Sequence, residues 1–129
     1  MLMPAGTYYV GDLCYVMHNE WDEFCDLTTD GMRCLDGVFQ LSDGRKFATF
    51  STKYGDGEYY DQLGNSYSVD AGLIGCIRVE DLTEEIRVGT GKICRFDSDF
   101  SVGSRNGLIT IGHLVIDTAE EYEEEYDEE

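Results

Sequence analysis

Short apolar segments alternate with glycine-containing turns along most of this chain, and this pattern restricts it to a strand-rich fold. Residues 37–41 and 46–52 are rich in aromatic and β-branched side chains, and Asp43-Gly44 lies between them. An Asp-Gly pair between two such segments is typical of a tight β-hairpin turn. Two further hairpins are predicted from the same signals, one joining 59–62 to 66–69 and one turning at 105–107 into 108–116.

Residues 19–27 predict the clearest helix of the chain. Asn19 is a favourable N-cap, and acidic residues follow it in the first turn. Trp21, Phe24 and Cys25 have the i, i+3, i+4 spacing of an apolar helix face. Residues 73–79 form a continuous apolar run, which predicts a central strand covered on both faces. A second short helix is expected at 80–85, and further strands are expected at 6–10, 14–17, 86–89, 92–96 and 100–102.

About eight to ten short strands with one or two short helices predict a mainly β fold, a β-rich member of the α+β class. We expect a twisted antiparallel sheet rolled into a small barrel or sandwich. The chain has 129 residues, near the commonest domain size, and is 42% hydrophobic, which is enough to build a core without disulfides. The predicted organisation is a single domain over residues 1–116 and an acidic tail over residues 117–129.

The five cysteines are an odd number, and no two of them have the C-x-x-C spacing of a zinc or redox site. They predict free thiols in a reducing cytoplasm. The alternative is a nucleophilic Cys14 activated by His18 or His113. The N-terminal residues lack the basic and apolar regions of a secretion signal, and no apolar run approaches the roughly 20 residues of a membrane helix. We therefore expect a cytoplasmic protein that does not contact membranes.

The net charge of −18 is the strongest functional signal in the composition. Nine acidic residues and no basic residue lie in 117–129, and the remaining excess of nine negative charges lies in the first 116 residues. Such a chain repels nucleic acid and anionic membranes and favours basic partners, divalent cations or simple solubility. The tail is either disordered, helical, or an imitation of a phosphate backbone with aromatic stacking groups. Its candidate partner-binding residues are Glu120, Glu121, Tyr122, Glu123, Glu124, Glu125, Tyr126 and Asp127.

A stretch rich in glycine, tyrosine and acid contains Asp56, Glu58 and Asp61, which are candidate ligands for a hard cation or a small molecule. Their spacing does not match the twelve-residue calcium loop, and the alternative is a structural turn. Asp70 follows a predicted strand, where it either caps backbone N–H groups or serves as a catalytic carboxylate paired with Asp56 or Asp12. No nucleophile, phosphate-binding loop or oxyanion partner accompanies them, which favours a protein that is not an enzyme.

The two histidines do not have the spacing of metal ligands, and no cofactor is expected. His18 lies at the predicted helix start and is expected to be exposed. His113 lies in the predicted strand 108–116. Alternation along that strand would place His113 on the same face as Ile111 and Val115, either hydrogen-bonded in the core or half-exposed.

Four short motifs carry a resemblance to a known group of proteins. They are Pro-Ala-Gly-Thr-Tyr from Pro4, Gly-Asp-x-Cys-Tyr from Gly11, Tyr-Gly-Asp-Gly from Tyr54 and Val-Asp-Ala-Gly from Val69. Their order over residues 4–79 resembles a group of small uncharacterised proteins from bacteria and their phages. The usual Gly-Asp-Pro is Gly-Asp-Leu in this chain. The resemblance implies a bacterial or phage origin, and it implies no activity.

Three functions are compatible with these observations. The leading hypothesis is a non-enzymatic, acidic binding or inhibitor protein that acts on a host protein with a basic, nucleic-acid-binding surface, as anti-defence proteins that imitate DNA do. The alternative is a small-ligand-binding or hydrolytic protein that uses Asp56, Asp61 and Asp70 around a pocket at one end of the sheet. A virion structural component is the third. The sequence leaves the oligomeric state open.

Overall fold

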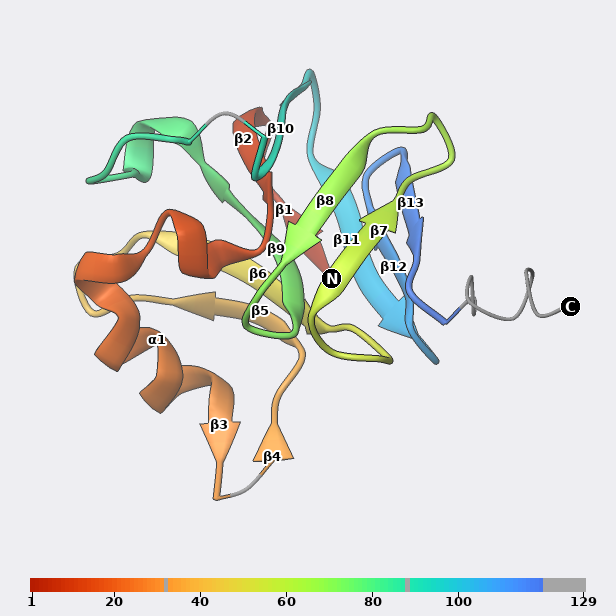
Figure 1. Cartoon of the computed structure of the whole chain (residues 1–129). Coiled ribbons are helices and arrows are strands. Elements are labelled where there is room, and N and C mark those ends of the chain that lie inside the picture. Colours follow the sequence, from red (N-terminus) through yellow and green to blue (C-terminus); the bar gives the residue numbers. More distant parts are fainter. Residues whose placement is uncertain (32, 88, 120–129) are drawn as a thin grey trace, which may run out of the picture.

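Two antiparallel sheets lie face to face in the computed structural model, which describes residues 1–31, 33–87 and 89–119 (Figure 1). Two short hairpins and a set of short helices complete the described part. The five-stranded sheet has the order β10 (Gly91–Phe96), β2 (Gly6–Gly11), β9 (Leu73–Arg78), β6 (Lys46–Ser51) and β5 (Gly37–Gln40). The four-stranded sheet has the order β1 (Leu2–Met3), β11 (Phe100–Arg105), β12 (Leu108–Ile111) and β13 (Leu114–Asp117).

The hairpins and helices occupy the connections between these strands. The helical segments are the 3-10 helices η1 (Leu13–Tyr15), η2 (His18–Glu20) and η3 (Val79–Asp81) and the α-helix α1 (Trp21–Thr28). The hairpins are β3 (Thr29–Asp30) with β4 (Arg33–Cys34), and β7 (Gly57–Tyr60) with β8 (Ser66–Val69). Together with the two sheets they confirm a mainly β fold of the sandwich type. No helix in the described ranges is long and apolar enough to cross a membrane.

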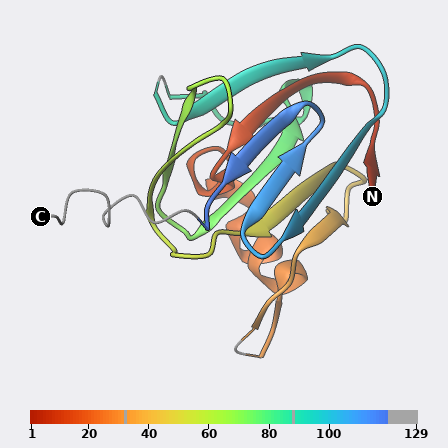
Figure 2. The ribbon, with the colours of Figure 1, turned by 90° about the vertical axis from the view of Figure 1, so that its right-hand side faces the viewer.

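The main core lies between the two sheets, and Figure 2 shows the four-stranded sheet from its outer side with the five-stranded sheet behind it. Tyr8 and Val10 of β2 project into this core because alternate residues of a strand face the same side. The Tyr8 ring meets the Phe100 ring edge-on, with centroids 5.0 Å apart. Phe96 of β10 stacks on Phe100 at 3.9 Å. These aromatic contacts join β2 and β10 of one sheet to β11 of the other.

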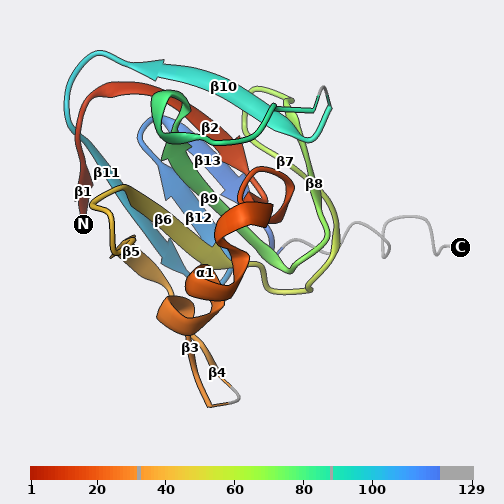
Figure 3. The same ribbon diagram turned by 90° about the vertical axis from the view of Figure 1, so that its left-hand side faces the viewer.

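A second core covers the opposite face of the five-stranded sheet. Tyr9 of β2, Phe47 of β6 and Ile77 of β9 pack there against Leu13 of η1 and Phe24 of α1. Figure 3 shows α1 lying across this face. The sheet is therefore buried on both sides, which is the physical reason why β9 has a continuous apolar sequence. The predicted central strand is confirmed, since β9 lies between β2 and β6.

The three predicted hairpins are present. β5 pairs with β6, β7 pairs with β8, and β11 pairs with β12. The last of these turns at Asn106 and Gly107, whose φ angles of 52° and 88° are those that an Asn-Gly turn requires. The predicted helix is also present as α1, but Asn19 does not cap it. Asn19 lies in η2 instead, where its side-chain amide donates to the Thr83 hydroxyl, and the residue at the α1 N-cap is Glu20.

Four predicted elements differ from the structure, and a side-chain cap or a glycine turn explains two of them. Residues 14–17 are not a strand, because the Asp12 carboxylate caps the Cys14 N–H and starts η1. The short helix expected at 80–85 is reduced to η3. No strand includes the described residues of 86–89.

The predicted strand 108–116 is divided into β12 and β13 by a turn at Gly112 and His113. Gly112 has a φ of 60°, and the Phe96 ring lies 2.4 Å from the position where a Cβ would be. The turn therefore needs glycine for both its backbone conformation and its space. As a consequence His113 is exposed in the turn and does not continue the face of Ile111 and Val115, so the prediction of a strand histidine was wrong.

Candidate functional site

A buried carboxylate joins two segments that lie far apart in the sequence. Asp12 is fully buried, and one of its oxygens accepts a hydrogen bond from the backbone N–H of Cys14 at 2.9 Å. The other oxygen accepts from the N–H groups of Asp70 and Ala71, both at 2.7 Å. Asp12 thus ties η1 to the loop after β8. Because both of its oxygens are occupied, Asp12 holds backbone in place and does not form an acid–base pair with Asp70.

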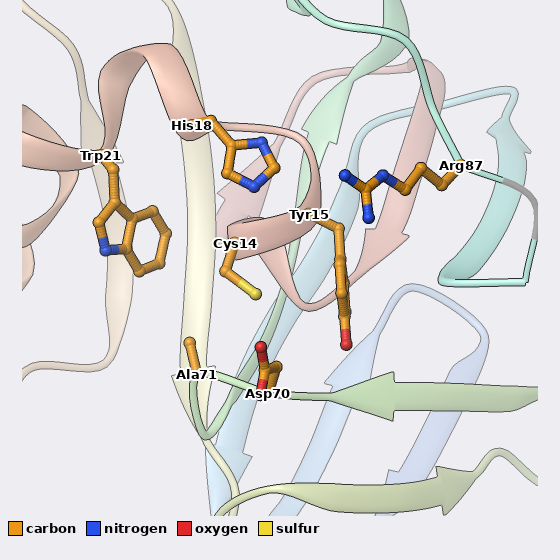
Figure 4. A pocket seen from close by; sticks show the side chains of 7 residues that line it. All are labelled: Cys14, Tyr15, His18, Trp21, Asp70, Ala71 and Arg87. Carbon is orange, nitrogen blue, oxygen red and sulfur yellow. The ribbon is translucent and has the colours of Figure 1, made fainter.

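A pocket of about 400 Å³ opens beside this junction (Figure 4). Three chain segments form it: η1 with the start of α1, the loop after β8, and the loop after η3. In Figure 4 Trp21 and Tyr15 border it on opposite sides, and Cys14 lies between them. Asp70 lies below, His18 lies above, and Arg87 lies to the upper right, beyond Tyr15. The lining residues are Cys14, Tyr15, His18, Trp21, Asp70, Ala71 and Arg87.

Hydrogen bonds and ring stacking hold the walls of the pocket in position. His18 Nδ1 lies 2.7 Å from Glu84 Oε1, and the other Glu84 oxygen accepts the Asn19 N–H at 2.7 Å. These contacts fasten η2 to the segment that follows η3. The Trp21 ring stacks on the buried Phe24 ring, with centroids 4.5 Å apart and planes 9° apart. The pocket is therefore largely formed before any ligand arrives.

The thiol of Cys14 is a poor nucleophile in this setting. Burial, and after it the nearby carboxylates of Asp12 and Asp70, together raise the pKa of Cys14 to about 12. The thiol therefore stays protonated near neutral pH. The Nδ1 atom of His18 is engaged with Glu84, and His113 lies beside Cys94, with 3.9 Å between Nε2 and Sγ. The geometry does not favour the alternative of a histidine-activated Cys14.

Asp61 has a structural role in the turn between β7 and β8. Its carboxylate accepts hydrogen bonds from the N–H groups of Leu63 and Asn65, from the Asn65 amide, and from the Tyr67 hydroxyl at 2.6 Å. Burial by itself would raise the pKa of Asp61, but the hydrogen bonds from Tyr67 and Asn65 outweigh it, and the pKa lies below its ordinary value. This arrangement matches the predicted alternative of a structural turn.

The sequence-derived carboxylates do not converge on one site. Asp56 and Asp70 flank the same end of the β7–β8 hairpin, because Gly57 pairs with Val69. Asp61 lies at the other end, roughly 16 Å from Asp56 at about 3.3 Å per strand residue. Of the candidates Asp56, Glu58, Asp61 and Asp70, only Asp70 lines the pocket, and Asp56 and Glu58 are exposed. Within the described ranges no three His, Cys, Asp or Glu side chains are grouped to hold a metal ion.

An acidic surface lies on the opposite side of α1 from the core. Asp22 and Asp26 of α1 and Asp30 of β3 are exposed, and their carboxylates have no ion pair or hydrogen bond among the described residues. α1 has no basic residue. The candidate tail residues Glu120, Glu121, Tyr122, Glu123, Glu124, Glu125, Tyr126 and Asp127 lie outside the described residues.

No family model, curated protein or solved structure matches this chain. The resemblance to small bacterial and phage proteins therefore stays a prediction. The structure adds one fact to it: the Gly-Asp-x-Cys-Tyr and Val-Asp-Ala-Gly motifs are in direct contact through Asp12.

Sequence reasoning singled out three residues that line the pocket, Asp70 as a candidate ligand or catalytic carboxylate and Cys14 with His18 as an alternative nucleophile and base. It missed the others. Tyr15 was assigned to a strand, Trp21 to the core face of a helix, and Arg87 to a strand. The signal that could have found the pocket is the pairing of Asp12 with residues 70–71, which are separated from it by 58 and 59 positions. Nothing local in the sequence indicates such a pairing.

Proposed function

We propose that this protein is a non-enzymatic binding protein whose acidic surface docks onto a basic surface of a partner protein. The observation that carries the proposal is α1, whose outer side presents Asp22 and Asp26 with no basic residue in the helix. Asp30 adds a third exposed carboxylate on the β3–β4 hairpin, where its cross-strand neighbour is the exposed Arg33. The acidic tail residues 120–127 would add to this surface.

The placement of these carboxylates is unfavourable for the isolated helix. Asp22 and Asp26 are four residues apart, where like charges destabilise a helix by a few tenths of a kcal/mol. Asp26 also lies in the last turn of α1, where the helix dipole disfavours negative charge. A cationic partner would relieve both effects. Asp22 lies in the first turn, where the helix dipole favours negative charge, so the cost falls mainly on Asp26. The cost at Asp26 supports an interaction role for the α1 surface.

The partner class follows from the sign and density of the charge. A surface with closely spaced carboxylates complements the Lys- and Arg-rich channels that bind phosphate backbones. We therefore propose a host protein with a basic, nucleic-acid-binding surface as the target, and inhibition by occupation of that surface as the mode of action. Association would be fast and sensitive to salt. A bacterial cytoplasm would be the setting if the resemblance to bacterial and phage proteins holds.

The proposal is tested by affinity capture from a bacterial lysate at about 50 mM and about 500 mM salt, followed by binding measurements on the captured protein. The variants are Asp22→Asn/Asp26→Asn and a truncation that ends at Ala119. The truncation spares Thr118, which is buried and donates to the Gly107 carbonyl. The matched control, Asp56→Asn/Glu58→Gln, removes the same charge from the exposed side of the β7–β8 hairpin.

The expected partner binds nucleic acid, loses affinity for this protein by tenfold or more at the higher salt, and is released by competing DNA. Asp22→Asn/Asp26→Asn should weaken binding several-fold, and the control should not. A partner that binds equally well at both salt concentrations, or equally to the α1 variant and the control, would contradict the proposal.

A further inference from the structure

We propose that the pocket between Trp21, Tyr15, Asp70 and Arg87 binds a small zwitterion with an aromatic body, an aromatic α-amino acid. This ligand site is independent of the acidic surface on α1. The pocket lies at the junction of η1, the loop after β8 and the loop after η3 (Figure 4).

Two opposite charges in this one pocket carry the inference. The Arg87 guanidinium and the Asp70 carboxylate both line the pocket, and neither has an ion pair or hydrogen bond with another described residue. In Figure 4 Asp70 lies below the space, and Arg87 lies to the upper right, on the far side of Tyr15. A ligand carboxylate can accept from the guanidinium fork, and a ligand ammonium can donate to Asp70.

The net charge of the chain restricts the ligand further. At −18 the protein repels anions at long range, so a phosphorylated ligand with two negative charges would be disfavoured. A simple cation would be attracted, but it would meet the Arg87 guanidinium inside the pocket. A zwitterion has no net charge and satisfies both groups at once. A zwitterion therefore fits both the two charged groups in the pocket and the negative net charge of the protein.

The remaining lining is aromatic or apolar except for His18, whose Nδ1 lies 2.7 Å from the Glu84 carboxylate. Trp21 and Tyr15 border the space on opposite sides, and Trp21 is held by its stacking on Phe24. Cys14 contributes a protonated thiol and Ala71 a methyl group, and neither adds a charge. Aromatic side chains favour aromatic ligands in offset-stacked or edge-to-face contact. The volume of about 400 Å³ is at the lower end of the range for small-molecule sites, which suits a single amino acid.

The chain has a built-in reporter for this test, because Trp21 is its single tryptophan. The fluorescence of Trp21 is followed while the full chain is titrated with L-phenylalanine, with phenethylamine, which lacks the carboxylate, and with 3-phenylpropionate, which lacks the amine. Isothermal calorimetry measures the same three affinities without relying on fluorescence. We expect saturable binding of L-phenylalanine and at least about tenfold weaker binding of each analogue, since each loses one charge-assisted contact.

Two variants separate the roles of the two charges. Arg87→Gln should weaken the binding of L-phenylalanine by about tenfold and leave the affinity for phenethylamine unchanged. Asp70→Asn should weaken the binding of L-phenylalanine and leave the affinity for 3-phenylpropionate unchanged. Asp70→Asn keeps the backbone N–H that donates to Asp12, and Arg87 is exposed, so both variants should fold. Arg105→Gln, an exposed arginine on β11, is the matched control and should bind all three compounds like the unaltered chain.

Three results would overturn the proposal. One is the absence of saturable L-phenylalanine binding to the folded protein. Another is equal affinity for all three compounds, which would show an apolar patch without charge recognition. The third is tighter binding of adenosine monophosphate than of L-phenylalanine, which would assign the pocket to a phosphorylated ligand. None of these outcomes bears on the proposed binding of a basic partner to the acidic surface. The two proposals are therefore tested independently.

Discussion

At the scale of single residues, Asp12 has the widest consequences in this structure. A carboxylate without exposure to solvent is costly unless its oxygens are hydrogen-bonded, and Asp12 meets that condition with three backbone N–H donors. The same three bonds start η1 and position the loop that contains Asp70. The Asp61 carboxylate is likewise hydrogen-bonded, by donors within its own turn and by Tyr67. Each carboxylate replaces backbone partners that the adjoining strands do not supply.

Replacing Asp12 should therefore destabilise the whole domain. We expect Asp12→Ala to lower the free energy of unfolding by about 3 kcal/mol, because it leaves three N–H groups without an acceptor. Asp12→Asn should cost less, since one amide oxygen remains. Urea unfolding measures both. Asp56→Asn, at an exposed position, is the control and should stay within about 0.5 kcal/mol of the unaltered chain. A cost for Asp12→Ala as small as that of the control would refute this role of Asp12.

At the scale of elements, the β7–β8 hairpin depends on Asp61 and is fastened to the edge of the four-stranded sheet. Gln62 donates to the His113 carbonyl at 2.6 Å and accepts from the Val115 N–H at 2.8 Å. The hairpin therefore covers part of the free edge of β13, which would otherwise present unpaired backbone groups.

The Asp61 turn should give the domain a specific pH dependence. Its pKa is lowered in the folded protein, so the ionised carboxylate contributes stability above the ordinary value of about 3.9, and this contribution is lost as the pH falls through the folded-state pKa. We expect Asp61→Asn to lower the free energy of unfolding by about 1–3 kcal/mol at pH 7 and by less below about pH 3.5. Urea unfolding at both pH values tests this, and a difference that grows in acid would have the wrong sign.

The centre of the five-stranded sheet requires a glycine at position 75, where no side chain fits. A Cβ on Gly75 of β9 would lie 2.0 Å from the Ala48 carbonyl oxygen of β6, whereas a Cβ on Gly103 of β11 would meet nothing within 4 Å. Gly75→Ala should therefore cost more than about 3 kcal/mol or prevent folding. Gly103→Ala is the matched control and should change the free energy of unfolding by less than about 1 kcal/mol. The melting temperatures of the two variants, measured by thermal unfolding, test this prediction. Equal melting temperatures would show that β6 and β9 can move apart to accommodate the added Cβ.

At the scale of the whole molecule, the dominant property is the excess of negative charge. Residues 120–129 contain eight acidic residues, and the described part of the chain has a further excess of carboxylates. Such self-repulsion destabilises a compact state and is screened by salt. The charge is therefore a cost to folding, which is consistent with a role in binding.

Raising the ionic strength from about 10 mM to about 150 mM should increase the melting temperature of the full chain. The increase should be smaller for the truncation that ends at Ala119, because eight carboxylates are removed. Differential scanning calorimetry of both proteins at the two salt concentrations provides the measurement. A melting temperature that does not change with salt, in either protein, would show that the charges are too far apart to repel.

The sequence by itself determined the strand-rich class, the three hairpin turns, the central position of β9 and the existence of α1. These features depend on residues close together in the chain: an Asn-Gly pair favours the positive φ angles of a tight hairpin turn, and a continuous apolar run favours burial. Such signals act locally and can be read without knowing the neighbours.

Only the tertiary structure decided η1, the division of β12 from β13, and the pocket. Residues 14–17 have the composition of a strand, but the burial of Leu13 and Val16 against α1, together with the Asp12 cap, places residues 14 and 15 in η1 and leaves 16 and 17 outside any strand. The pocket needs Tyr15, Asp70 and Arg87 to meet, and they come from three segments that are separated in the chain. Contacts of this kind depend on how two sheets and a helix pack, because each residue alone is equally compatible with a core, a turn or an exposed surface.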